Sequence, residues 1–171
     1  MVDEINMLRA VPAQLKNSAK QGLDNQGALK TEVVQFETAF DLDQAADTLS
    51  TDNVMFPGTP SDIYVIEGFR PKVSEAFAFT TLEPQIGLVA AGGTPSTGAI
   101  ATHSFATTQA VGDEVQGTYQ SAKTYANPKL KVSGGTLYEV GIVQRPTGGI
   151  VTGQIKLLKI DYRRARSKDA D

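Results

Sequence analysis

Apolar and polar residues alternate along much of the chain after residue 31, and this alternation predicts strands. In the first such run, the positions expected to share one face are Val34, Phe36, Thr38 and Phe40. A two-residue period is typical of a strand with one buried face. Later apolar runs predict further strands at Val54–Phe56, Ile63–Val73, Ala76–Leu82, Gln85–Ala90, Ile100–Phe105, Val115–Tyr119, Lys129–Ser133, Leu137–Gln144 and Val151–Tyr162.

About eight to ten short strands separated by turns predict an all-β fold, an antiparallel β-sandwich or a barrel. Pro71 cannot donate a ladder hydrogen bond, so its end of the strand is expected at a sheet edge or a bulge. Ser133–Thr136 predicts a hairpin turn, as does Pro146–Gly149. The last run, Val151–Tyr162, is the longest expected strand and is apolar on both faces, which places it centrally or at a subunit interface.

The first 31 residues have a different pattern. Met7, Leu8, Val11 and Leu15 have the spacing of a short amphipathic helix, although Pro12 would have to lie in its first turn or break it. The polar, Gly-containing stretch that follows predicts an arm or linker, and the alternative is a frayed terminus without a role. We therefore expect an arm at 1–31, a sandwich domain at 32–163 and a polar tail at 164–171.

Composition narrows the function classes. The net charge of -3 and the pI of about 5.2 do not favour nucleic-acid binding, and no apolar run is long enough to cross a membrane. The N-terminus lacks the pattern of a secretory signal. The chain has no Cys, which excludes disulfides and thiolate metal sites and suits synthesis in a reducing cytosol.

Candidate catalytic chemistry is sparse. His103 is the only histidine, and adjacent Ser104 should point to the opposite face of a strand, so the two are not expected to form a nucleophile–base pair. We interpret His103 as an exposed or hydrogen-bonded strand residue. No catalytic residue, metal ligand or cofactor is predicted.

Three other clusters have a functional and a structural interpretation. Asp41, Asp43 and Asp47 could bind calcium, but the spacing is not that of an EF-hand loop, and a solvated polar stretch with room for one helical turn is preferred. Gly92, Gly93 and Gly98 lack the Lys-Ser/Thr and the following helix of a phosphate-binding loop.

A basic cluster is expected just beyond the last strand. It consists of Arg163, Arg164, Arg166 and Lys168. Charged residues at a terminus usually form a solvated tail, and the alternative is a foot that docks on an acidic partner surface.

Residues Ala45–Phe77 resemble a pattern found in small structural proteins of tailed bacteriophages. The matching parts are Ala45–Leu49, Val54–Phe56, Gly58–Pro60, Ile63–Phe69 and Glu75–Phe77. Tyr125, Pro128, Gly134–Thr136 and the closing apolar strand extend the similarity over about residues 36–162. The turn Gly58–Pro60 is shorter than in that pattern, which leaves the family open. The resemblance implies a jelly-roll-like virion component, often a capsid decoration (cement) protein that forms trimers or other homo-oligomers.

The sequence thus predicts a non-enzymatic structural protein made in the host cytoplasm and located on the capsid surface of the virion. Its partners would be the major capsid protein or other virion subunits, with no nucleic acid and no membrane. The expected contacts to capsid or subunits are Leu8, Val11, Leu15, Arg163, Arg164 and Arg166. The alternative function is a tail or fibre component that binds a host surface glycan.

Overall fold

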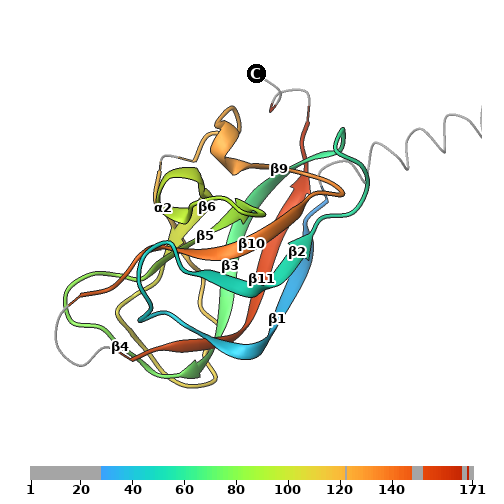
Figure 1. Ribbon diagram of the computed structural model, residues 1–171. Coiled ribbons are helices and arrows are strands. Elements are labelled where there is room, and N and C mark those ends of the chain that lie inside the picture. Colours follow the sequence, from blue (N-terminus) through green and yellow to red (C-terminus); the bar gives the residue numbers. More distant parts are fainter. Residues whose placement is uncertain (1–27, 122, 148–151, 167–168, 170–171) are drawn as a thin grey trace, which may run out of the picture.

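A computed structural model of the chain describes residues 28–121, 123–147, 152–166 and 169. Two antiparallel sheets face each other across one core, which confirms the all-β sandwich (Figure 1). Sheet A contains, in order, β1 (Lys30–Asp41), β11 (Gln154–Arg164), β3 (Ile63–Glu75) and β9 (Lys131–Ser133). Sheet B contains, in order, β2 (Leu49–Met55), β10 (Leu137–Gln144), β5 (Gln85–Ala90), β6 (Ile100–Ser104) and β8 (Thr118–Tyr119).

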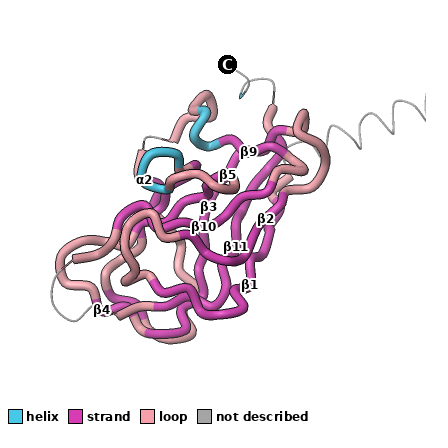
Figure 2. Tube along the Cα trace, in the orientation of Figure 1, coloured by secondary structure: helices cyan, strands magenta, loops and turns pink. Residues whose placement is uncertain are grey.

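The remaining elements are short, and loops make up much of one end of the molecule (Figure 2). β4 (Phe77–Ala78) pairs with β7 (Thr108–Gln109), and the helical elements are α2 (Pro95–Gly98) and the 3₁₀ turn η1 (Pro128–Leu130). Within the described ranges, no helix is long and apolar enough to cross a membrane.

The core lies between the inner faces of the two sheets and is rich in aromatic rings. Phe56 lies at the centre of one group, with ring centroids 5.0 Å from Tyr162 and 6.0 Å from Tyr138. On β1, Val34, Phe36 and Phe40 are buried as the alternation predicts. Thr38 is exposed, because the pairing of β1 with β11 shifts between Gln35 and Phe40 and breaks the period.

The predicted hairpin at Ser133–Thr136 is wrong. β9 pairs with β3 in sheet A, whereas β10 pairs with β2 and β5 in sheet B, so the turn carries the chain from one sheet to the other. Gly135 has the positive φ of 63° that such turns need. The predicted turn at Pro146–Gly149 also connects two sheets, but residues 148–151 lie outside the described ranges.

The last strand is central in its sheet, which is one of the two positions that the sequence predicts for it. β11 lies between β1 and β3 in sheet A, but with 11 residues it is shorter than β3, which has 13. Pro71 lies in β3 opposite Leu158, and the ladder is irregular nearby, between Ile155 and Leu157. The proline is therefore accommodated beside a bulge, and its carbonyl accepts a hydrogen bond from the Val115 N–H (3.3 Å).

Several predicted elements are shorter or different. The expected strand at Ala76–Leu82 is reduced to β4, and the segment between β1 and β2 forms turns without a helix. The glycine-rich loop does lead into a helix, but α2 has only four residues. Its Ser96 N–H donates to the Asp47 carboxylate (2.7 Å), which holds the first turn from a distant part of the sequence.

Candidate interaction surface

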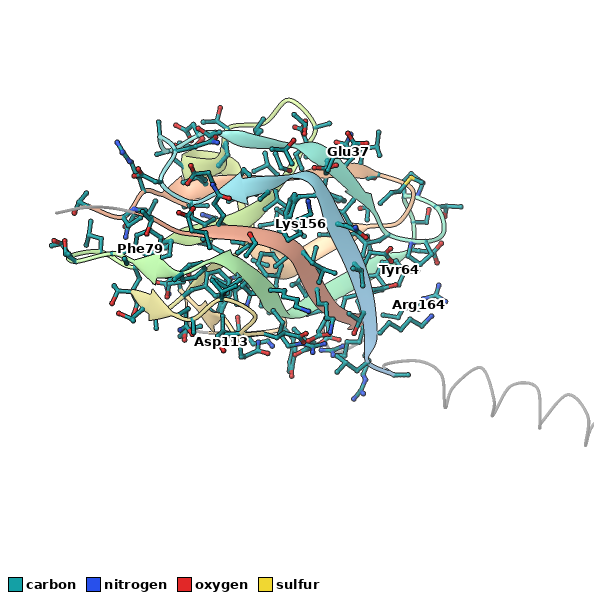
Figure 3. The ribbon with its side chains drawn as sticks, turned by 90° about the horizontal axis from the view of Figure 1, so that it is seen from below. Glu37, Tyr64, Phe79, Asp113, Lys156 and Arg164 are labelled. Atoms are coloured by element: carbon teal, nitrogen blue, oxygen red, sulfur yellow. The ribbon has the colours of Figure 1, made fainter. Side chains whose placement is uncertain are left out.

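Both ends of the described body lie at the same end of the sandwich. β1 and β11 are antiparallel, and Lys30 lies opposite Tyr162. The chain therefore enters sheet A next to the point where β11 finishes, and Arg164 lies beside the start of β1 (Figure 3). We call this end of the molecule the terminal pole. The predicted contacts Leu8, Val11 and Leu15 lie outside the described residues.

Arg163 belongs to β11 and is buried, which corrects the prediction of a solvated basic tail. Its guanidinium donates to Glu67 (Nε to Oε1, 2.8 Å) and to Asp169 (Nη1 to Oδ2, 2.6 Å). It also lies 4.4 Å from the centroid of the Tyr125 ring. The hydrogen bonds that Arg163 donates to Asp169 raise the pKa of Arg163 above its usual range. Arg163 therefore anchors the C-terminal residues to the body and has no free face for a partner.

Asp169 shows that the expected polar tail is partly folded onto the sandwich. Its carboxylate is fully buried and accepts hydrogen bonds from Arg163 and from the Arg166 N–H (2.7 Å). Sequence reasoning missed this pair because an arginine and an aspartate near a terminus look solvated. The sequence holds only a weak signal of this ion pair, which is the spacing of six residues between Arg163 and Asp169.

Arg164 and Arg166 are exposed, as a docking role requires. Arg164 donates from Nη2 to Asp62 Oδ1 (2.7 Å), and Asp62 also accepts from the Thr59 N–H (2.9 Å). The hydrogen bonds from Thr59 lower the pKa of Asp62. Arg166 and Lys131 line the same shallow hollow, and neither has an ion-pair partner in the described part of the chain. The terminal pole therefore presents uncompensated positive charge.

The outer face of sheet A beside this pole holds a closed network of charges. Asp161 accepts two hydrogen bonds from Arg70, each 2.7 Å long, and one from the Thr31 hydroxyl (2.7 Å). Glu114 accepts from Arg70 (2.7 Å) and from Lys159 (2.6 Å). Arg70 lowers the pKa of Asp161 through these hydrogen bonds. The network ties β1, β3 and β11 together, so we assign it to rigidity and not to binding.

His103 is buried and hydrogen-bonded. Its Nδ1 lies 2.7 Å from the Ala101 carbonyl oxygen, and its ring stacks on Phe69 at a centroid distance of 4.5 Å. Burial lowers its pKa from 6.5 to about 4, so the ring is neutral at pH 7 with Nδ1 carrying the proton. Ser104 accepts a hydrogen bond from the Gln120 amide and makes none to His103.

The three aspartates of the proposed calcium loop do not converge. Asp41 accepts from the Asp43 N–H (2.9 Å), Asp43 pairs with Arg145 (2.8 Å) and Asp47 holds Ser96. Across the described ranges, no three acidic or histidine side chains form a metal-binding group.

A polar hollow beside β6 was not foreseen from the sequence. Its walls include Gln85, Thr102, Tyr119, Gln120 and Lys129. Ala101 lies in the same wall with a φ of 52°, a strained conformation for a non-glycine residue, at a bulge in the β5–β6 pairing. An alanine carries no sequence signal for that conformation.

Comparisons of this chain with protein families, curated proteins and solved structures find no match. The class that the fold defines is an antiparallel β-sandwich with a basic terminal pole.

Proposed function

We propose that this chain is a non-enzymatic structural component of a tailed-phage particle, a decoration protein that binds the outside of the head lattice through its terminal pole. The observation that carries the proposal is the arrangement of the two chain ends. The chain enters β1 at the same pole at which the exposed Arg164 and Arg166 lie. The N-terminal segment and these two arginines can therefore reach one partner surface.

The strand order supports this assignment. Without the two-residue strands β4, β7 and β8, eight strands remain. Numbered along the chain, they lie in the orders 1-8-3-6 and 2-7-4-5, which is the order of a jelly roll. Jelly rolls are frequent in viral capsid proteins, although a fold alone does not define a function.

The chemistry of the pole favours an acidic protein surface as the partner. Arg164, Arg166 and Lys131 would face carboxylates of the lattice, while apolar residues of the N-terminal segment, Leu8, Val11 and Leu15, would contact a neighbouring subunit. A specific contact buries about 1,600 Å² in total, and a homo-oligomer, with a trimer as the expected form, would add avidity over the lattice.

A pelleting assay with expanded capsids that lack this chain tests the proposal. The full chain should co-sediment, and the double variant Arg164→Glu/Arg166→Glu should lose binding at least ten-fold. The matched control is Arg145→Glu, since Arg145 is similarly exposed and paired with an aspartate but follows β10 at the opposite end. Failure of the full chain to sediment, or equal loss in the control, would overturn the proposal.

A second candidate function is the binding of a host surface glycan by a tail or fibre component. The polar hollow beside β6, with Tyr119 and Gln120 in its wall, is the observation that favours it. A glycan array probed with the full chain decides between the two. Hits that disappear in Gln120→Ala would support glycan binding, and an array without hits would count against it.

A further inference from the structure

A groove on the outer face of sheet A lies away from the charged pole residues. It runs across β3 and β11 towards the turn that precedes Glu114, and its lining is Gln35, Lys72, Val73, Ser74, Val111, Gly112, Lys156 and Leu157. Val111 is 63% exposed, and Leu157 is half-buried although it faces away from the core cluster. The groove floor is thus apolar and open to solvent.

Two further observations describe the polar groups of this groove. The Ser74 hydroxyl is buried and has no hydrogen-bond partner in the described structure, whereas buried polar atoms nearly always have one. Lys72 and Lys156 lie on the rim without an ion-pair partner among the described residues, and Lys156 makes only one long hydrogen bond, 3.4 Å to the Glu37 carbonyl.

We propose that the groove is the docking site of the chain's own N-terminal segment, with Met7, Leu8, Val11 and Leu15 packed on its apolar floor. The segment would lie folded back on sheet A before any partner binds. This inference goes beyond the virion role and holds whether or not that role is correct.

Local charge complementarity at the start of the segment favours this occupant. Asp3 and Glu4 lie four and three residues before Met7, and the groove rim offers Lys72 and Lys156. The later Arg9 and Lys16 would have to face solvent. A carboxylate placed next to these ammonium groups of the rim would compensate charges that the described body leaves unpaired.

The length of the chain is sufficient for docking within one molecule. The groove begins at Gln35, five residues from Lys30, which is about 17 Å along a strand. Residues 16–28 would bridge this distance, and thirteen residues of flexible chain have an r.m.s. span of about 20 Å. Val33 is 48% exposed and lies on the outer face of β1 between the two points. A linker matched to its span raises the effective concentration to about millimolar.

Paramagnetic relaxation in the full-length chain tests the proposal. The chain has no native cysteine, so Ala10→Cys accepts one spin label at a unique site, next to the four residues that would pack on the groove and not among them. In a dilute sample of isotope-labelled, spin-labelled chain, the amides of Lys72, Ser74 and Gly112 should lose intensity several-fold. The amides of Ser96 and Thr97, on sheet B's side of the molecule, should not change.

Variants and isotope mixing make the result decisive. Val111→Asp should restore the groove amide intensities, and the double variant Lys72→Glu/Lys156→Glu should do the same. Lys129→Glu is the control and should leave the broadening unchanged, because Lys129 is exposed but lies outside the groove. Unchanged groove amides in the labelled chain would overturn the proposal. Broadening that occurs when isotope label and spin label sit on different chains would also overturn it, because a second copy would then be the occupant.

Discussion

At the scale of single residues, His103 and Arg163 are two of the six polar or charged residues that are buried in the described part of the chain. Each side chain contacts a residue that is distant in the sequence, Phe69 for His103 and Glu67 for Arg163. His103 stays neutral because its environment excludes water, and the charge of buried Arg163 is compensated by the carboxylates of Glu67 and Asp169.

His103 should make the stability of the protein pH-dependent. Its pKa is 6.5 when unfolded and about 4 when folded, so the unfolded chain binds the extra proton between these values. The free energy of unfolding should therefore fall by about 1.4 kcal/mol per pH unit, roughly 3 kcal/mol in all, as pH drops from about 6.5 to about 4. Urea denaturation at several pH values measures the slope.

The control for this prediction is His103→Phe, which keeps a ring against Phe69 and removes the titration. Its stability should be flat over the same window except for carboxylate titration, which both proteins share. An equal slope in the two proteins would show that His103 does not carry the effect.

Arg163→Met should destabilise the fold by about 3–5 kcal/mol, because it leaves the Asp169 carboxylate buried without its guanidinium partner. Arg164→Met, one residue along the chain, should cost less than about 1 kcal/mol, since the Arg164–Asp62 pair is exposed. Chemical denaturation of both variants gives the comparison. Arg163→Met/Asp169→Leu should recover part of the loss, and a further loss in that double variant would contradict the assignment.

At the scale of elements, the turn after β9 packs closely against the loop after β2, and this packing fixes how sheet A is connected to sheet B. The Gly134 N–H donates to the Asp62 carbonyl (2.8 Å), and the Gly135 N–H donates to the Phe56 carbonyl (2.8 Å). The turn that crosses from sheet A to sheet B is thereby fixed against the loop after β2. These backbone contacts need close approach, which a side chain at Gly134 would prevent.

Gly134→Ala should destabilise the protein by about 1–3 kcal/mol, because its Cβ would lie 2.3 Å from the Pro57 carbonyl oxygen and 2.9 Å from that of Thr59. Gly98→Ala is the matched control, since nothing lies within 4 Å of its Cβ and it should change stability by less than about 0.5 kcal/mol. Thermal unfolding followed by circular dichroism measures both. Equal melting temperatures would refute the steric argument.

The elements that the sequence predicts best are those governed by local pattern. The expected strands Gln85–Ala90 and Leu137–Gln144 agree with β5 and β10 at both ends. Strand pairing is different, because it depends on contacts between distant residues. The Ser133–Thr136 turn has the composition of a hairpin, and only the competition between two sheets shows that its flanking strands do not pair.

At the scale of the whole molecule, the class of fold could be predicted from the sequence, whereas the charge and shape of the surface could be predicted only in part. Alternation and turn spacing indicate a sandwich regardless of strand order. The basic character of Arg164 and Arg166 was evident, but the burial of Arg163 follows from Glu67 on β3 and from the folded-back Asp169. The apolar groove was not predictable, because it combines Gln35 of β1 with short stretches of β3, β11 and a loop that are distant in the sequence.

The adjacent chain ends have a mechanical consequence. Because β1 and β11 are antiparallel and both ends lie at one pole, a force that pulls the ends apart opens their ladder one residue pair at a time, like a zip. A force between the start of β1 and the start of β11 would instead load all pairs of the ladder together, in shear.

Single-molecule stretching can compare the two directions. Handles at Leu29→Cys and Arg166→Cys should unfold the protein at a clearly lower force than handles at Leu29→Cys and Thr152→Cys, since Thr152 precedes β11 at the far end. Equal forces would mean that another contact resists first. If unzipping is the easy direction, a particle that holds this subunit by both ends would peel it open under tension, so a durable attachment would have to press the pole onto its support and not pull on it.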